Sequence, residues 1–163
     1  EVFEIDLSEI RPIVAKPHFV DNVVPAEECS GIRIDEAFLG SCNNGRIEDL
    51  RVGAELLRGR KVADSVRFLV VPASRAVYEE ALREGLLKIF MDAGAIVMNP
   101  NCSVCWGSCQ GVIGEGETLI STGTRNFKGR SGHKDSFVYL ASAATVTASA
   151  VKGEICTAES LTK

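Results

Sequence analysis

Three cysteines in this sequence have the residue type and spacing to hold a metal centre. Cys102 and Cys105 are separated by only two residues, so both thiolates can face one centre. Cys42 is distant in sequence, but like the pair it directly follows a segment that we predict to be a buried strand. Three thiolates favour an iron–sulfur cluster with one iron left without a protein ligand, and such an open position is typical of a catalytic site.

Two other chemistries are compatible with the same cysteines. Zinc could be bound by Cys102, Cys105 and Cys109 with Cys42 or His133 as the fourth ligand. A thioredoxin-like dithiol could use the Cys102–Cys105 pair alone, although it would leave the distant cysteine without a role. Both alternatives stay open at this level.

The other cysteines are expected to be structural. The six cysteines do not predict disulfides, because the sequence shows no secretory segment and is long enough to bury a sizeable core. Cys29 and Cys156 are therefore expected to behave as small buried hydrophobic residues.

A polar loop at residues 121–130 supplies a second set of candidate binding groups. Its guanidinium groups, Arg125 and Arg130, are accompanied by glycines and could bind carboxylates through paired hydrogen bonds. Two solvated surface arginines are the alternative. His133 is expected to order this loop rather than transfer protons, and His18 is expected to be an ordinary loop residue.

Strands and helices alternate along the segments that must position these groups. Apolar runs predict strands at 32–39, 66–71, 95–98 and 118–121, and helical periodicity predicts helices at 75–83, 86–92 and 141–150. A further helix is expected between a cap at Asn43 or Asn44 and Gly59. This pattern predicts an α/β fold, a three-layer α/β/α sandwich around a mostly parallel sheet.

The candidate ligands follow the carboxyl ends of these strands. Segments 40–42, 101–102 and 121–122 each lie at or just past the carboxyl end of a predicted strand. Ligands bind at that edge of open α/β sheets, so the three loops are expected to converge there.

The first 30 residues are expected to stand apart from this domain. Residues 1–7 alternate apolar and acidic side chains, which suits an edge strand or an extended lead-in, and Pro12, Pro17 and Pro25 argue against regular structure up to residue 30. We therefore expect an arm at 1–30 and a single α/β domain at 31–163. Because the chain starts at Glu1 rather than Met, we expect it to be the C-terminal piece of a longer protein.

Composition excludes several classes of function. The 163 residues carry a formal net charge of −4, which argues against general binding to nucleic acid or to anionic membranes. No apolar run approaches the length of a transmembrane helix. A cytoplasmic location with reduced thiols is expected.

Long motifs of this sequence resemble the iron–sulfur hydro-lyases of the aconitase superfamily. The resemblance is greatest to the branch formed by the large subunits of 3-isopropylmalate dehydratases and homoaconitases, of the archaeal type. It covers nearly the whole chain and is carried by the motifs at Gly40–Arg51, Val70–Arg75, Asn99–Cys105, Ser121–Arg130, Gly132–Asp135 and Tyr139–Ser142.

The resemblance implies an activity and a role for each site residue. It implies that Cys42, Cys102 and Cys105 hold a [4Fe–4S] cluster, and that Arg125 and Arg130 bind the carboxylates of a di- or tricarboxylate substrate. The enzyme would isomerise a 2-hydroxy acid by dehydration and rehydration, as in leucine biosynthesis, where 2-isopropylmalate becomes 3-isopropylmalate.

The resemblance also implies partners. The serine base of such enzymes belongs to a separate small subunit with a swivelling domain, and other acid–base groups belong to N-terminal domains of the large subunit. No catalytic residue is therefore expected in this segment, which would be inactive alone and would lose its cluster in air.

Some positions depart from the family pattern. Asn43 stands where threonine is usual, Thr124 where asparagine is usual, and Trp106 and Cys109 occupy a stretch that is usually small and ends in histidine. A homoaconitase is the alternative within the family. A zinc-binding or redox-sensing module that is not an enzyme is the alternative of another class.

Overall fold

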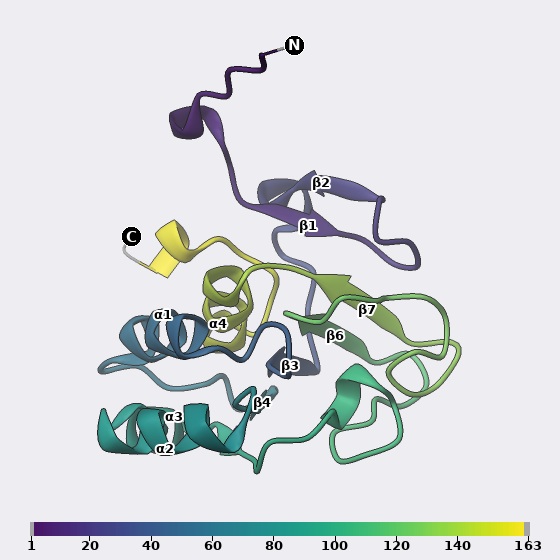
Figure 1. The fold of residues 1–163 in the computed structure, drawn as a ribbon. Helices are drawn as coiled ribbons and strands as arrows, with labels where there is room; N and C mark the ends of the chain where they lie inside the picture. The colour runs from purple at the N-terminus through teal and green to yellow at the C-terminus, as the bar shows by residue number, and fades with distance from the viewer. Residues whose placement is uncertain (1, 162–163) are drawn as a thin grey trace.

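Seven strands form one mixed sheet in the order β2-β1-β7-β6-β3-β4-β5 within residues 2–161, the part of the chain that this computed structural model describes (Figure 1). The strands are β1 (Ile13–Ala15), β2 (Val23–Pro25), β3 (Glu36–Leu39), β4 (Arg67–Val70), β5 (Ile96–Val97), β6 (Thr118–Ser121) and β7 (Phe137–Leu140). The helices are α1 (Ile47–Leu57), α2 (Arg75–Arg83), α3 (Leu86–Ala93) and α4 (Ala143–Lys152), with short 3-10 helices η1 (Leu7–Glu9), η2 (Ala26–Cys29), η3 (Ser103–Cys105) and η4 (Ala158–Leu161).

The central strands are parallel and the edge near the N-terminus is antiparallel. β7, β6, β3, β4 and β5 pair in parallel with their neighbours, whereas β1 is antiparallel to both β2 and β7. The α/β class and the mostly parallel sheet predicted from the sequence are therefore confirmed.

Each face of the sheet is covered by a different kind of structure. Ala37 and Leu39 of β3 point into a large apolar cluster with the helices, whereas Phe38 between them points into a smaller cluster on the opposite face. This alternation follows from the two-residue period of a strand. The smaller cluster is closed by Val104 of η3 and by Ile113, so a cysteine-bearing segment, rather than an α-helix, covers this second face (Figure 1).

The ends of the helices agree with the sequence signals except at α1. The Ser74 hydroxyl caps α2 by accepting a hydrogen bond from the backbone of Val77 at 3.3 Å, which agrees with the helix predicted to start at residue 75. At α1 the predicted cap at Asn43 or Asn44 is wrong, because the cap residue is Arg46, whose backbone N–H donates to Asp49 Oδ2 at 3.1 Å. Asn44 instead donates its side-chain amide to the carbonyl of Thr122.

Two strand regions differ from the expectation. The arm predicted for residues 1–30 contains the β1–β2 hairpin, which joins the sheet through pairing of Ala15 with Leu140, because the prolines stand at or beyond the ends of these short strands. Strand β7 was not predicted, although it is a β-branched and aromatic run. Residues 2–6 form the extended lead-in, and Glu1 lies outside the described residues.

Candidate functional site

A pocket at the carboxyl ends of β3 and β6 brings the predicted cysteines together. The pocket encloses about 170 Å³ and is lined by residues from three separate loops. Cys42, Cys102 and Cys105 all line it, as does Arg130. The convergence of the three loops, expected from the topology of parallel sheets, is therefore observed.

Close backbone packing shapes the loop that carries Cys42. A Cβ atom on Gly40 would lie 2.8 Å from the carbonyl oxygen of Val71, and one on Gly45 would collide with the same oxygen. Only glycine allows this approach. The buried Thr122 hydroxyl holds the start of the loop, since it accepts from Gly40 N–H at 3.0 Å and donates to Gly40 O at 2.7 Å.

The loop that carries Cys102 and Cys105 is closed by the serine between them. Ser103 is fully buried and has a φ of +46°, a left-handed conformation that is uncommon outside glycine. Its hydroxyl donates to the carbonyl of Gln110 at 2.8 Å, and its backbone N–H donates to Asn101 Oδ1 at 2.5 Å. These bonds fix the short η3 turn that presents both thiols to the pocket.

The arginine loop, residues 121–130, contacts the cysteine loop through Arg130. The Nε of Arg130 donates to the carbonyl of Cys105 at 2.7 Å, and its guanidinium lies 5.6 Å from the ring centre of Phe127. Gly107 packs so closely on the Arg130 carbonyl that a Cβ there would collide with it. Arg125 is exposed, bonds to the carbonyl of Thr124 at 2.6 Å and does not line the pocket.

The other predicted residues lie outside the pocket. Cys109 is exposed and is not among the lining residues. His133 shapes the next turn, where its backbone N–H donates to Ile113 O at 2.9 Å and its Nδ1 accepts from the backbone of Asp135 at 3.2 Å. His18 stacks on Phe137 with ring centres 6.0 Å apart.

Cys29 and Cys156 are buried, as their structural interpretation requires. Burial raises the pKa of both thiols, which keeps them protonated and unreactive. All six cysteines are free.

The cysteines of the pocket are the candidate donors for a metal centre. Among residues 2–161, no group of three or more histidine, cysteine, aspartate or glutamate side chains is placed so that it could hold one metal ion, and this applies to Cys42, Cys102 and Cys105 as well as to the predicted zinc ligands. In an iron–sulfur cluster each thiolate binds a different iron, so the ligands need only surround a common cavity. Three free thiols lining one pocket fit that requirement.

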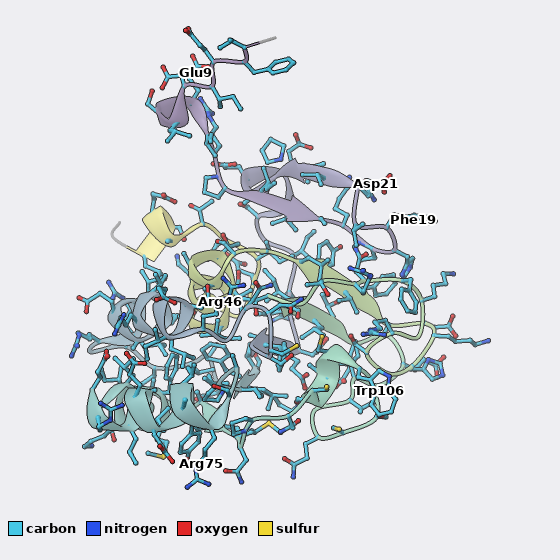
Figure 2. All side chains as sticks on the ribbon, viewed as in Figure 1. Glu9, Phe19, Asp21, Arg46, Arg75 and Trp106 are labelled. Carbon is cyan, nitrogen blue, oxygen red and sulfur yellow. The ribbon has the colours of Figure 1, made fainter. Side chains whose placement is uncertain are left out.

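Sequence reasoning missed several residues that build the pocket. Thr122 and Asn44 connect the loops after β6 and β3, yet a threonine and an asparagine in polar loops carry no sequence signal for such a role. Trp106 lines the pocket although the residue is 60% exposed, and its only sequence signal is its departure from the family pattern. Figure 2 shows it on the segment that follows η3, far from Arg75 at the start of α2.

Comparisons with known proteins give one consistent result. The model of the aconitase family (aconitate hydratase) matches residues 1–153.

None of the described helices has the length and hydropathy needed to span a membrane.

Similar curated proteins are large subunits of 3-isopropylmalate dehydratases. A probable large subunit from Methanothermobacter thermautotrophicus is 57% identical over 154 residues, which cover 94% of this chain and 37% of the relative. The large subunit 1 of Methanopyrus kandleri is 54% identical and covers 93% of this chain and 36% of its own length. The Aquifex aeolicus large subunit is 50% identical, and the match covers 99% of this chain and 39% of the relative. The chain thus spans a little over a third of the length of these relatives.

Proposed function

The chain belongs to the aconitase family, and from this premise we propose that it is the cluster-bearing part of a 3-isopropylmalate dehydratase large subunit. The complete enzyme would convert 2-isopropylmalate to 3-isopropylmalate in leucine biosynthesis, in the cytoplasm. The observation that supports this proposal most is the pocket itself, where Cys42, Cys102, Cys105 and Arg130 from three loops line one cavity.

Each thiol has a clear task in this proposal. Cys42, Cys102 and Cys105 would hold a [4Fe–4S] cluster, with one iron left for substrate. When bound, such a cluster supplies a Lewis acid that polarises the hydroxyl group to be removed. The protein contributes the fixed loop conformations described above, since Ser103 and Thr122 hold two cysteine loops in place before any ligand binds.

Arg130 would bind a substrate carboxylate. Its Nε is occupied by the carbonyl of Cys105, but within residues 2–161 neither of its Nη groups has a hydrogen-bond partner. Two parallel donors of this kind match a carboxylate. Arg125 lies earlier in the same loop and is exposed. It would contribute a second positive charge when substrate is bound and the remaining domains cover the pocket.

The proton transfers need a group from elsewhere in the enzyme. The described pocket lining contains no carboxylate and no imidazole, so it offers no ordinary general base. This fits a base contributed by the small subunit, whose existence is implied by the large-subunit name of the relatives. The chain alone would then be inactive.

The proposal is tested with the full-length large subunit and its small subunit, reconstituted with iron and sulfide without oxygen. We expect interconversion of 2- and 3-isopropylmalate, and no turnover by residues 1–163 alone. A control with homocitrate distinguishes the homoaconitase alternative. Absence of turnover of both substrates, in an assembled enzyme that carries its cluster, would contradict the proposal.

A further inference from the structure

One buried side chain joins the arginine loop to the β1–β2 hairpin. Asn126 is fully buried and donates both of its amide hydrogens, to the carbonyl of Lys16 at 2.8 Å and to that of Phe19 at 3.2 Å. The two carbonyls belong to the turn between β1 and β2, more than 100 residues earlier in the sequence. Figure 2 shows Phe19 at the tip of this hairpin.

The orientation of this amide is fixed by its partners. If the two ends of the amide were exchanged, its oxygen would face carbonyl oxygens, which cannot donate a hydrogen. The buried Oδ1 has no hydrogen-bond partner among the described residues. Asn126 therefore supplies two donors to the hairpin at the cost of an unsatisfied buried acceptor.

The hairpin that accepts these bonds is itself held in place. Ala15 of β1 pairs with Leu140 of β7, and His18 in the turn stacks on Phe137. The turn is closed by the backbone of Lys16, which donates to Asn22 O at 2.8 Å. The two carbonyls that accept from Asn126 therefore belong to a turn that is itself attached to the sheet.

The neighbours of Asn126 make this anchor significant. Arg125 and Phe127 on either side are exposed, so the chain turns inward only at Asn126. Arg130 follows four residues later and is joined to the anchor through its backbone N–H, which donates to the Phe127 carbonyl at 3.0 Å. Arg125 is adjacent to this attachment, whereas Arg130 is held both through Phe127 and by its own bond to the Cys105 carbonyl.

We infer that Asn126 is a positioning residue that fixes the loop of Arg125 and Arg130, the proposed carboxylate-binding arginines, by fastening it to the β1–β2 hairpin. This inference rests on the proposed function for the role of the arginines, but the attachment itself does not. Loss of two buried hydrogen bonds of ordinary strength should increase opening of the loop about tenfold or more.

The first test measures steady-state kinetics of the assembled, cluster-loaded enzyme with 2-isopropylmalate. Asn126→Ala should raise KM about tenfold while kcat falls less and the iron content per chain is unchanged. The matched control is Asn22→Ala, which removes an exposed amide bonded to Pro17 O at 3.3 Å in the same hairpin turn. It should leave KM within about twofold of the wild type.

A pH profile separates positioning from general damage. In Asn126→Asp a buried carboxylate would face two carbonyl oxygens, an arrangement that favours its protonated, donating form. Its KM defect relative to the wild type should therefore shrink as the pH is lowered from 8 to 6. Asn126→Ala should show no such recovery. Asn126→Ser, which keeps one donor, replaces the alanine variant if that variant does not fold.

The second test does not depend on the activity. Hydrogen–deuterium exchange of the full-length large subunit should be about tenfold faster in peptides covering residues 124–131 of Asn126→Ala, and unchanged in Asn22→Ala. If exchange is faster but no isopropylmalate turnover is found even in the wild type, the proposed function fails and the attachment stands. Unchanged exchange and KM, or an equal loss of stability throughout the chain with no selective change in KM, would overturn the inference.

Discussion

Polar side chains at the two ends of the parallel strands differ in whether they are paired within the chain. At the amino end, Glu36 of β3 is fully buried and accepts a hydrogen bond from Arg67 Nε at 3.0 Å. The same guanidinium binds Glu117 through two bonds of 2.9 and 2.7 Å. At the carboxyl end, Cys42 and Cys102 are exposed, free thiols beside an open pocket.

We interpret this difference as one between groups that stabilise the sheet and groups that are available to bind a ligand in the proposed function. Charges at the amino end find partners within the chain, and the partners come from β3, β4 and the turn before β6. At the carboxyl end, backbone groups are bonded by Thr122 and Ser103. The exposed thiol of Cys42 donates to Oδ1 of the adjacent Asn43 at 3.7 Å, and the Nη groups of Arg130 are left available. The following predictions test this contrast.

The largest effect is expected at the carboxyl end. Arg130→Ala removes a charged double donor from the pocket and the bond to the Cys105 carbonyl, so kcat/KM for 2-isopropylmalate should fall by about 100-fold or more. Arg125→Ala, at an exposed position outside the pocket lining, should cost about tenfold. Equal losses in the two variants, measured in the assembled enzyme, would contradict the unequal roles of the arginines.

The amino end should control how stability depends on pH. Burial raises the pKa of Glu36 from 4.5 to about 7, against the opposing effect of its hydrogen bond to Arg67. Protonated Glu36 is thus favoured in the folded state, and its contribution to stability is complete below pH 4.5 and is lost as the pH rises through 7. The free energy of unfolding should fall by on the order of 3 kcal/mol between these limits from this group.

The control for this pH dependence is Glu36→Gln, which keeps an acceptor for Arg67 but cannot ionise. Chemical denaturation of the 163-residue chain should show a flatter pH profile in this variant. A variant whose stability falls between pH 5 and pH 8 as steeply as that of the wild type would show that Glu36 does not set this pH dependence.

Removing Arg67, the partner of Glu36, should change the free energy of unfolding by less than the pH change does. Arg67→Ala leaves a buried carboxylate without its cation, and we expect a loss of about 2 kcal/mol at pH 8, because half of the ion pair is exposed to solvent. The loss should shrink at pH 5, where Glu36 is mostly protonated. Arg75→Ala, which breaks an exposed pair with Glu79, is the control and should cost less than about 0.5 kcal/mol. A loss independent of pH would argue against a role for the charge on Glu36.

The smallest effect is expected from the hydroxyl that shapes the pocket. Thr122→Val keeps the volume of the side chain but removes both bonds to Gly40, which should cost about 1 to 2 kcal/mol in the free energy of unfolding. Thr145→Val is a comparison within α4 and should cost less, because among the described residues the hydroxyl of Thr145 makes one hydrogen bond, accepted from Ser142 Oγ at 3.2 Å. If both variants were equally stable, Thr122 would not hold the Cys42 loop as we describe.

Much of the fold was predictable because its signals are local. Apolar runs located β4 and β6, and helical periodicity located α2 and α3. Strand β7 was not predicted, because its four residues lie between a polar loop and a stretch of small residues that was assigned to a helix. The α1 cap was wrong because Asn44 is used in a contact with Thr122, 78 residues away, which no local pattern reveals.

The site was predictable in its residues but not in its connections. Spacing and the position of strand ends brought three cysteines to one edge, and the structure shows them lining one pocket. The bonds that set the loops, from Ser103, Thr122 and Asn126, join segments distant in sequence or depend on a left-handed residue. Such tertiary hydrogen bonds have no signature in composition or periodicity.

The central claim is that Cys42, Cys102 and Cys105 jointly hold one iron–sulfur cluster at this pocket. The most direct test is the iron and sulfide content, with the visible absorbance, of the anaerobically reconstituted full-length large subunit and its single Cys→Ser variants. We predict close to four irons and four sulfides per chain in the wild type and in Cys109→Ser, and a colourless or rapidly bleached protein in each of the three ligand variants. A full cluster retained in any of those three variants would contradict the account.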